Sequence, residues 1–121
     1  MEEYITIQKD EVAEITEKKS KFIANLYYIQ DVQDAETKIK EIRKIYHDAR
    51  HHCIAYRVLE SGNLIEKSSD DGEPSGTAGA PMLNILQKNN LCNVLVVVTR
   101  YFGGILLGTG GLVRAYTEVT Q

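Results

Sequence analysis

The chain has 121 residues, of which 43% are hydrophobic and 26% are charged, and its formal net charge at pH 7 is −3. This length suits one domain, and a net negative charge provides no overall field that attracts nucleic acid. No apolar run approaches the roughly 18–20 residues that cross a membrane, and the acidic N-terminus lacks the basic and apolar regions of a secretory signal. Cys53 and Cys92 each lie in an apolar, strand-like segment, so we expect reduced core thiols and a cytoplasmic protein.

The first half of the chain predicts two strands, a helix and a second strand pair. The side chains of residues 12–29 alternate as in two strands joined by a turn at residues 17–20. Asp31 then suits the N-cap of an amphipathic helix, because apolar residues follow at intervals of three and four: Val32, Ala35, Ile39, Ile42 and Tyr46. Residues 53–59 are predicted to form a strand that turns into a partner strand near residues 64–67.

The second half predicts a loop, a helix and a buried strand. Residues 68–77 are too rich in Ser, Asp, Gly and Pro for regular structure. Thr77 suits the N-cap of a helix that tolerates Pro81 in its first turn and ends at Asn89-Asn90. The nearly continuous apolar run of residues 91–99 predicts a strand that is covered on both faces or at least central.

A last helix is expected to begin near Thr109 and to bury one stripe, formed by Leu112, Tyr116 and Val119. It reaches Gln121 without a C-cap signal, so we expect residues 1–121 to be the N-terminal part of a longer chain. Together these elements predict an α+β fold. We expect a two-layer sandwich in which a mainly antiparallel sheet of four to five strands carries helices packed on one face.

A glycine-rich loop follows the apolar strand and holds five of the nine glycines of the chain: Gly103, Gly104, Gly108, Gly110 and Gly111. Glycine allows positive φ angles and close backbone approach. Unpaired N–H groups at the start of the last helix, with Arg100 and Arg114 nearby, would form a cradle for phosphate, sulfate or carboxylate at residues 108–111. The alternative is that the glycines only let the loop fold tightly against the sheet. The pattern matches neither a Walker P-loop nor G-x-G-x-x-G.

A second candidate site is the acidic loop, in which Asp70, Asp71 and Glu73 are followed by Thr77. Carboxylate oxygens suit Mg²⁺ or Ca²⁺, although the spacing is not that of an EF-hand. A second interpretation is a solvated turn whose aspartates bond their own backbone. A third is a loop that folds toward Arg100 and holds it by a charge-assisted hydrogen bond.

A third candidate is the histidine group of His47, His51 and His52, next to Cys53. Its nitrogen and sulfur atoms would suit zinc, and the alternative is a set of surface histidines at a helix end. Two aromatic residues after the strand would either stack on a base or pack against the core: Tyr101 and Phe102. No nucleophile motif is present, and we expect no metal ion, no cofactor and no catalytic residue.

Three separated blocks of sequence, in order, resemble the IMPACT family, including its bacterial YigZ-type members. The first is His52-Cys-Ile-Ala-Tyr56, and the second runs from Asp70-Asp-Gly-Glu-Pro to Gly79. The third block begins with Gly79-Ala-Pro-Met-Leu and ends, after residues 84–96, with Val-Val-Thr-Arg100-Tyr-Phe-Gly-Gly-Ile-Leu-Leu-Gly108. The resemblance extends from about Lys18 onward.

The resemblance implies the two-layer fold shared by the second domain of a small-subunit ribosomal protein and by domain IV of elongation factor G. It also implies a link to translation, since eukaryotic members compete, in amino-acid starvation, for the activator of the kinase that phosphorylates an initiation factor. Bacterial members usually carry a further, smaller, ferredoxin-like C-terminal domain, before which this chain is expected to end. For the bacterial members the resemblance supplies no biochemical activity.

These observations predict a non-enzymatic, translation-linked regulatory or binding domain. Its expected surface for RNA phosphate or a ribosome-associated protein combines both loops with the neighbouring histidines: Arg100, Tyr101, Gly103, Gly104, Gly108, Gly110, Gly111, Arg114, His51, His52, Asp70, Asp71, Glu73 and Thr77. The alternative is a nucleotide- or phosphate-binding enzyme whose acidic loop holds Mg²⁺ through Asp70, Asp71 or Glu73. A third interpretation is that all three blocks only pack.

Overall fold

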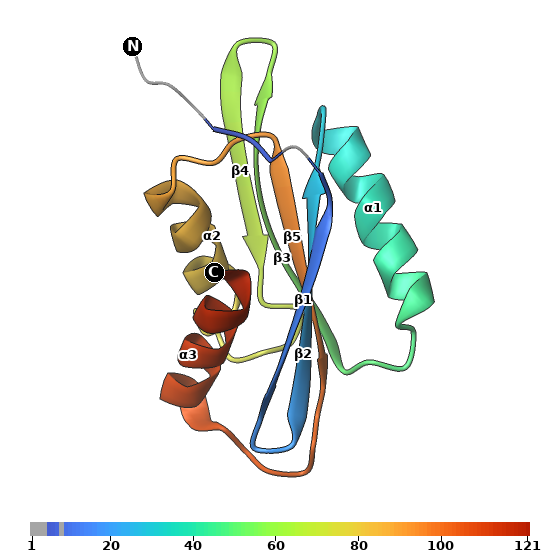
Figure 1. Cartoon of the computed structure of the whole chain (residues 1–121), viewed down its shortest axis with the longest axis vertical. Helices are drawn as coiled ribbons and strands as arrows, with labels where there is room; N and C mark the ends of the chain where they lie inside the picture. Colours follow the sequence, from blue (N-terminus) through green and yellow to red (C-terminus); the bar gives the residue numbers. More distant parts are fainter. Residues whose placement is uncertain (1–4, 8) are drawn as a thin grey trace.

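The computed structural model describes residues 5–7 and 9–121, which contain a five-stranded antiparallel sheet and three helices (Figure 1). In chain order the elements are β1 (Glu11–Glu17), β2 (Ser20–Tyr28), α1 (Val32–Ile45), β3 (His51–Glu60), β4 (Asn63–Ser69), α2 (Gly79–Lys88), β5 (Val94–Tyr101) and α3 (Gly108–Thr120). The strand order is β1-β2-β5-β3-β4, so the last strand in the sequence lies at the centre. Within these described ranges no helix combines the length and apolar character of a membrane span.

Two tight hairpins form the outer parts of the sheet. In the first, Glu17 pairs with Ser20 around Lys18 and Lys19, whose φ angles are 45° and 66°. Two consecutive positive φ values are typical of a type I′ turn, whose twist matches that of the flanking strands. The turn between β3 and β4 has the same pattern, with φ values of 51° and 80° at residues 61 and 62. The predicted turns are therefore confirmed.

The central strand β5 is buried on both sides of the sheet. Successive side chains of a strand point to opposite faces. Val94, Val96 and Val98 accordingly belong to one hydrophobic cluster, while Leu95 and Val97 belong to another. The prediction of a central strand covered on both faces is confirmed.

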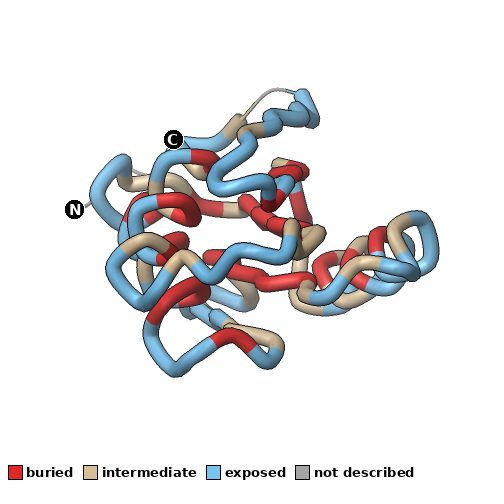
Figure 2. Tube along the Cα trace, turned by 90° about the horizontal axis from the view of Figure 1, so that it is seen from below, coloured by how far each residue is buried: buried red, intermediate tan, exposed pale blue. Residues whose placement is uncertain are grey.

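Helices α2 and α3 cover one face of the sheet, and α1 covers the opposite face (Figure 1). The first cluster joins the buried sides of α2 and α3 to β2, β3 and β5 through residues that include Met82, Leu86, Leu112, Tyr116, Phe22, Ala24 and Cys53. In the second, Ala35, Ile39 and Ile42 of α1 pack on β3 and β5 residues that include Ile54, Tyr56 and Val58. Buried segments therefore lie between the layers, with exposed chain around them (Figure 2).

The α+β class and the antiparallel sheet were predicted correctly, but the placement of all helices on one face was wrong. Apolar residues on both faces of β3 and β5 each need a cover, and one layer of helices would leave half of them in water. The α1 boundary was predicted well, since the Asp34 N–H donates to the N-cap side chain of Asp31 at 2.7 Å. The N-cap of α2 was predicted wrongly as Thr77. The N-cap residue is Ala78, whose side chain forms no hydrogen bond to the helix.

Candidate functional site

The predicted site residues gather near one end of the sheet. The register pairs His51, at the start of β3, with Arg100, near the end of β5. The acidic loop, residues 70–78, leads from β4 to α2. The predicted glycine-rich loop is shorter than expected: residues 102–107 lead from β5 to α3, while Gly108, Gly110 and Gly111 belong to the start of α3. The Arg100–Glu73 contact brings the acidic loop to this end, and the Gly103–Ser20 contact brings the glycine-rich loop next to the β1–β2 turn.

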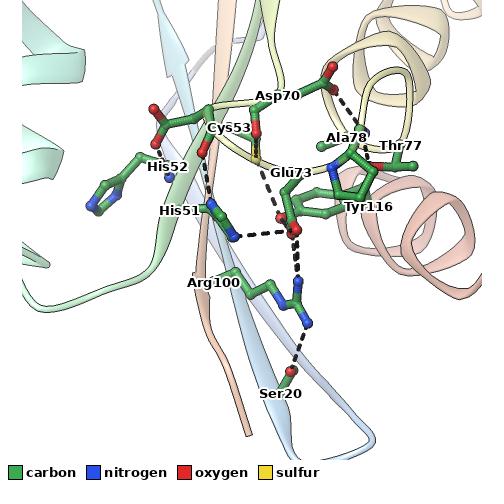
Figure 3. A network of polar contacts seen from close by, with 12 residues as sticks. Ser20, His51, His52, Cys53, Asp70, Glu73, Thr77, Ala78, Arg100 and Tyr116 are labelled. Atoms are coloured by element: carbon green, nitrogen blue, oxygen red, sulfur yellow. Dashed lines mark hydrogen bonds and ion pairs between the residues drawn. The ribbon is translucent and has the colours of Figure 1, made fainter. Parts of the chain in front are cut away.

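Arg100 is buried, and its guanidinium is paired inside the protein with Glu73. Its Nη1 donates to Glu73 Oε1 at 2.9 Å and to Oε2 at 2.8 Å, and its Nη2 donates to the Ser20 hydroxyl at 3.3 Å (Figure 3). Arg100 is 4% exposed and Glu73 7%. Of the three interpretations of the acidic loop, the structure shows the one in which the loop holds Arg100. The guanidinium therefore does not stand on the surface as an anion contact. The structure also shows an aspartate bonded to the backbone of its own loop, since Asp70 accepts from Gly76 and Ala78.

Two more buried groups complete this network. The Tyr116 hydroxyl donates to Glu73 Oε2, and the Cys53 Sγ lies 3.1 Å from the Asp70 carbonyl oxygen and 3.4 Å from the Tyr116 hydroxyl oxygen. Burial raises the pKa of the Cys53 thiol to about 12, and it also raises the pKa of Tyr116 above its ordinary value. Cys53 therefore stays protonated at neutral pH, whereas a nucleophilic cysteine needs its thiolate.

Asp70 accepts hydrogen bonds from the backbone at the start of α2. Its Oδ1 accepts from the N–H groups of Ala78 at 3.1 Å and Gly79 at 2.8 Å, and its Oδ2 accepts from Gly76 at 3.0 Å. Burial alone raises the pKa of Asp70, but these backbone hydrogen bonds outweigh it and hold the pKa below its ordinary value. Asp70 thus caps the helix for which Thr77 was predicted as the cap.

Asp71 connects the acidic loop to β3 and α1. Its Oδ2 accepts from the His52 N–H at 2.8 Å, and its Oδ1 accepts from Arg43 Nη2 at 3.1 Å. Burial raises the pKa of Asp71, but these two partners together lower it below the ordinary value. Over the described residues, no three or more His, Cys, Asp or Glu side chains form a group that could hold a metal ion. The three carboxylates predicted as Mg²⁺ ligands each bind a different set of protein groups.

His51 and His52 point to opposite faces of the sheet, as neighbours on a strand do. His51 Nδ1 lies 2.7 Å from the Asp71 carbonyl oxygen, and its Nε2 lies 3.4 Å from Glu73 Oε1. His52 is buried with its Nδ1 3.2 Å from the Thr99 hydroxyl, and burial lowers its pKa. Only His51 therefore joins the site, and the grouping of both histidines on one surface was wrong.

Thr77 and Tyr101 are held by contacts outside the predicted surface. The Thr77 hydroxyl donates to the Pro74 carbonyl at 2.6 Å, and Thr77 is buried. The Tyr101 hydroxyl donates to Asp48 at 2.9 Å, and its ring lies edge-on to Tyr46 with 6.4 Å between centroids. This geometry favours the packing interpretation of Tyr101.

The glycine-rich loop is fixed at its start by a close approach to the β1–β2 turn. A Cβ atom on Gly103 would lie 2.0 Å from the Lys19 carbonyl oxygen, so no side chain fits there. The Gly103 N–H also donates to the Ser20 hydroxyl at 3.2 Å, and Ser20 is the same residue that contacts Arg100. The buried network and the loop therefore share one anchor.

Two further glycines bracket the exposed part of this loop. Gly104 has a φ of 90° and Gly108 a φ of 76°, in the region that glycine adopts readily. An added Cβ would meet nothing within 4 Å at either position, so the conformation rather than space requires glycine. Between them lie Ile105, Leu106 and Leu107, which we call the tip.

The first turn of α3 lacks a side-chain cap, since its N-cap residue is Leu107. A Cβ on Gly110 would lie 3.4 Å from Arg114 Nη1, and a Cβ on Gly111 would lie 3.1 Å from the Cβ of Leu107. The exposed guanidinium of Arg114 therefore lies beside the start of the helix. Unpaired N–H groups and the positive end of the helix dipole favour an anion at such a place.

Hollows lie on two sides of the tip. One, of about 240 Å³, is lined by residues that include Arg50, His51, Phe102, Leu106, Gly108 and Thr109. The Arg50 guanidinium lies 4.7 Å from the centre of the Phe102 ring. A cation therefore lies at the edge of this hollow. The other, of about 270 Å³, is lined by Glu17, Lys18, Leu107, Gly111, Arg114, Ala115 and Glu118. Neither hollow lies over Asp70 or Asp71.

This chain carries the sequence pattern of a known family over most of its length. The Impact N-terminal domain matches residues 18–121. The chain belongs to the IMPACT family. It is 49% identical over 113 residues to the IMPACT family member YvyE of Bacillus subtilis. The matched region covers 93% of this chain and 52% of that relative. The chain likewise spans 59% of a Haemophilus influenzae member and 49% of YigZ of Escherichia coli, so it corresponds to about half of these relatives.

Two solved structures share the fold over 93% of this chain. One is described as the crystal structure of a hypothetical protein, with 42% identity, a TM-score of 0.87 and 55% of that chain covered. The other is the two-domain translational regulator Yih1, with 25% identity, a TM-score of 0.62 and 46% of that chain covered. The IMPACT resemblance and the α+β fold class are thereby confirmed.

Sequence reasoning missed three residues of this end of the molecule. Ser20 and Tyr116 complete the Arg100–Glu73 network, and Arg50 covers Phe102. Tyr116 was predicted only as an apolar stripe residue, although a buried tyrosine hydroxyl needs a hydrogen-bond partner. That requirement, together with an arginine at the end of a buried strand, was the available signal.

Proposed function

We propose that this chain is a translation-linked regulatory domain that acts in the cytoplasm by binding a ribosome-associated partner. Two relationships support a link to translation. The chain is similar in fold and sequence to Yih1, which is described as a translational regulator, and it is 44% identical over 98 residues to the IMPACT homolog of Dictyostelium discoideum. The partner contact that we assign is an anionic group at the start of α3.

The convergence of three positive features on residues 108–111 carries this proposal. The first turn of α3 has no side-chain cap, Arg114 lies beside Gly110, and Arg50 lines the hollow that Gly108 and Thr109 also line. Arg50 and Arg114 are both exposed. An anion placed there gains charge-assisted hydrogen bonds without displacing a partner of Arg100. The expected cradle is thus retained, with Arg50 in place of Arg100.

The carboxylates that an enzyme would use here already accept hydrogen bonds from other groups of the protein. This favours a binding function over the alternative of a nucleotide-binding enzyme. Glu73 accepts from Arg100 and Tyr116, and Asp70 accepts from three backbone N–H groups. A Mg²⁺ ion at the acidic loop would have to displace these donors. The Cys53 thiol, with its pKa of about 12, is likewise not a ready nucleophile.

Co-sedimentation with purified ribosomes over a salt series tests the proposal. The variant Arg50→Glu with Arg114→Glu is expected to bind at least tenfold more weakly than the unaltered chain, because each change replaces an attraction with a repulsion. Binding of the unaltered chain should also weaken as salt increases. The matched control is Lys40→Glu with Lys44→Glu, which makes the same charge change on exposed positions of α1. Equal ribosome binding by all three proteins would overturn the proposed contact.

A further inference from the structure

The tip carries the most exposed large apolar side chain in the described part of the protein. Leu106 is 80% exposed and Ile105 is 41% exposed. Single exposed apolar residues are ordinary, but here two are adjacent and stand on a loop of fixed shape. The fixed shape of the tip and the charges around it indicate what it contacts.

The tip is held at both ends before any partner arrives. On one side Gly103 packs against the Lys19 carbonyl, and on the other Leu107 packs against the first hydrophobic cluster. Gly104 and Gly108 set the two bends with positive φ. Since an ordered loop loses little conformational entropy on binding, an apolar side chain on it contributes most of its burial energy to affinity.

The surroundings of the tip are more positive than the chain as a whole. Arg50 lines the hollow on one side of the tip, and Lys18 and Arg114 line the other. Two carboxylates, Glu17 and Glu118, also line the second hollow. Arg100 and Glu73 line the first hollow but are buried and paired with each other. The exposed charges are therefore three cations and two anions, in a chain of net charge −3. The positive end of α3 adds to the cations. The complementary surface is therefore apolar at its centre and acidic at its rim.

We propose that Leu106 is the anchor by which this domain inserts into an apolar pocket, rimmed by carboxylates, on a protein partner. This inference rests on the proposed function and names the chemistry of the partner. An aliphatic side chain is buried well by a protein pocket, whereas RNA offers phosphates and aromatic base faces that favour cations and rings. A second copy of this chain would bring the same cations together, so a different protein fits better.

Site-specific photocrosslinking in the full chain tests this inference. The residue Ile105 is replaced by p-benzoylphenylalanine, and in the matched control the same replacement is made at Ile45, which is 66% exposed on α1. Irradiation in cells is expected to give a protease-sensitive adduct from position 105 and not from position 45. The adduct is then mapped to its segment on the partner, which should contain apolar residues flanked by Asp or Glu.

The partner so mapped is purified, and its affinity is measured for three further variants. Leu106→Ser should weaken binding by about ten- to a hundredfold, as expected when a buried leucine side chain is lost, while Leu106→Met should restore most of it. Ile45→Ser should bind as the unaltered chain does. Thermal unfolding of Leu106→Ser should be unchanged, since the side chain is exposed.

Several results would overturn the inference. They are a ribonuclease-sensitive adduct, an adduct of the chain with itself, no adduct, a mapped segment without acidic residues, or unchanged affinity of Leu106→Ser. If ribosome binding still depends on Arg50 and Arg114 in any of these cases, the proposed function stands and only the leucine anchor fails. If ribosome binding does not depend on the two arginines, but the adduct forms from position 105 and Leu106→Ser weakens binding, the anchor stands and the anion contact fails.

Discussion

Arg100 and Glu73 form a buried ion pair that ties the acidic loop to the central strand. Both oxygens of Glu73 accept from Arg100 Nη1, at 2.9 and 2.8 Å, and Tyr116 donates to one of them from α3. The pair therefore joins three segments that are far apart in the sequence. Because Ser20 contacts both Arg100 and Gly103, it also fixes the start of the loop that presents the tip.

Removing one partner of this pair should destabilise the domain strongly. Glu73→Gln leaves the Arg100 guanidinium buried without its counter-charge, and we expect a loss of about 3–5 kcal/mol in the free energy of unfolding. Urea unfolding measures it. The control Glu118→Gln, on an exposed residue of α3, should change stability by less than about 0.5 kcal/mol. A Glu73→Gln/Arg100→Met double variant should lose less than the sum of the two single changes, and simple additivity would contradict the pairing.

Asp70→Asn should destabilise the domain at neutral pH and have less effect in acid. The amide cannot accept all three backbone hydrogen bonds that Asp70 accepts, so we expect a loss of about 1–2 kcal/mol. Since the pKa of Asp70 is lowered in the folded state, its contribution is complete above the unfolded value of about 3.9 and decreases as the pH falls below it. Unfolding temperatures between pH 7 and pH 3 should show the gap between variant and unaltered protein narrowing below about pH 4. A gap that widens in acid would contradict a lowered pKa of Asp70 in the folded state.

Three glycine-to-alanine changes, two in the loop before α3 and one in α3 itself, should give three different outcomes. Gly103→Ala places its Cβ against the Lys19 carbonyl and should cost about 2–3 kcal/mol. Gly104→Ala meets no atom but keeps a positive φ, so we expect about 1–2 kcal/mol. Gly110→Ala lies in α3 at ordinary contact distance and should stabilise the helix by about 0.5–1 kcal/mol. Thermal unfolding ranks the three, and a destabilised Gly110→Ala would contradict the geometry.

The two cysteines should resist thiol reagents in the folded protein. Both are buried and free, and with a pKa of about 12 the thiolate fraction of Cys53 at pH 8 is on the order of one in ten thousand. We expect 5,5′-dithiobis(2-nitrobenzoate) to modify neither thiol until denaturant is added, after which both should react. The Cys53→Ala variant assigns the remaining signal to Cys92. Rapid modification of Cys53 at pH 8 would show that the network opens readily.

Local rules in the sequence were sufficient for most of the secondary structure. The Lys18-Lys19 turn, the Asp31 cap and the stripe of α1 depend on residues within a few positions of one another, and all were predicted. A strand boundary explains the misplacement of the two histidines in the site. With β3 taken to start at Cys53, both histidines were assigned to the helix end, whereas a start at His51 puts them on opposite faces.

The order of residues along the chain is enough to predict the periodic elements, the central apolar strand and the family, because each of these is a pattern in that order. The packing of the folded layers is what assigns Glu73, rather than Asp70 or Asp71, to Arg100, and what makes Asp70 the cap of a helix whose Gly79 lies nine residues later. Three neighbouring carboxylates are chemically alike, and their partners are selected by which donors the folded layers bring within hydrogen-bond distance. The same selection buries Arg100 and leaves Arg50 and Arg114 at the surface, since burial of a charge is tolerated only where a partner is already in place.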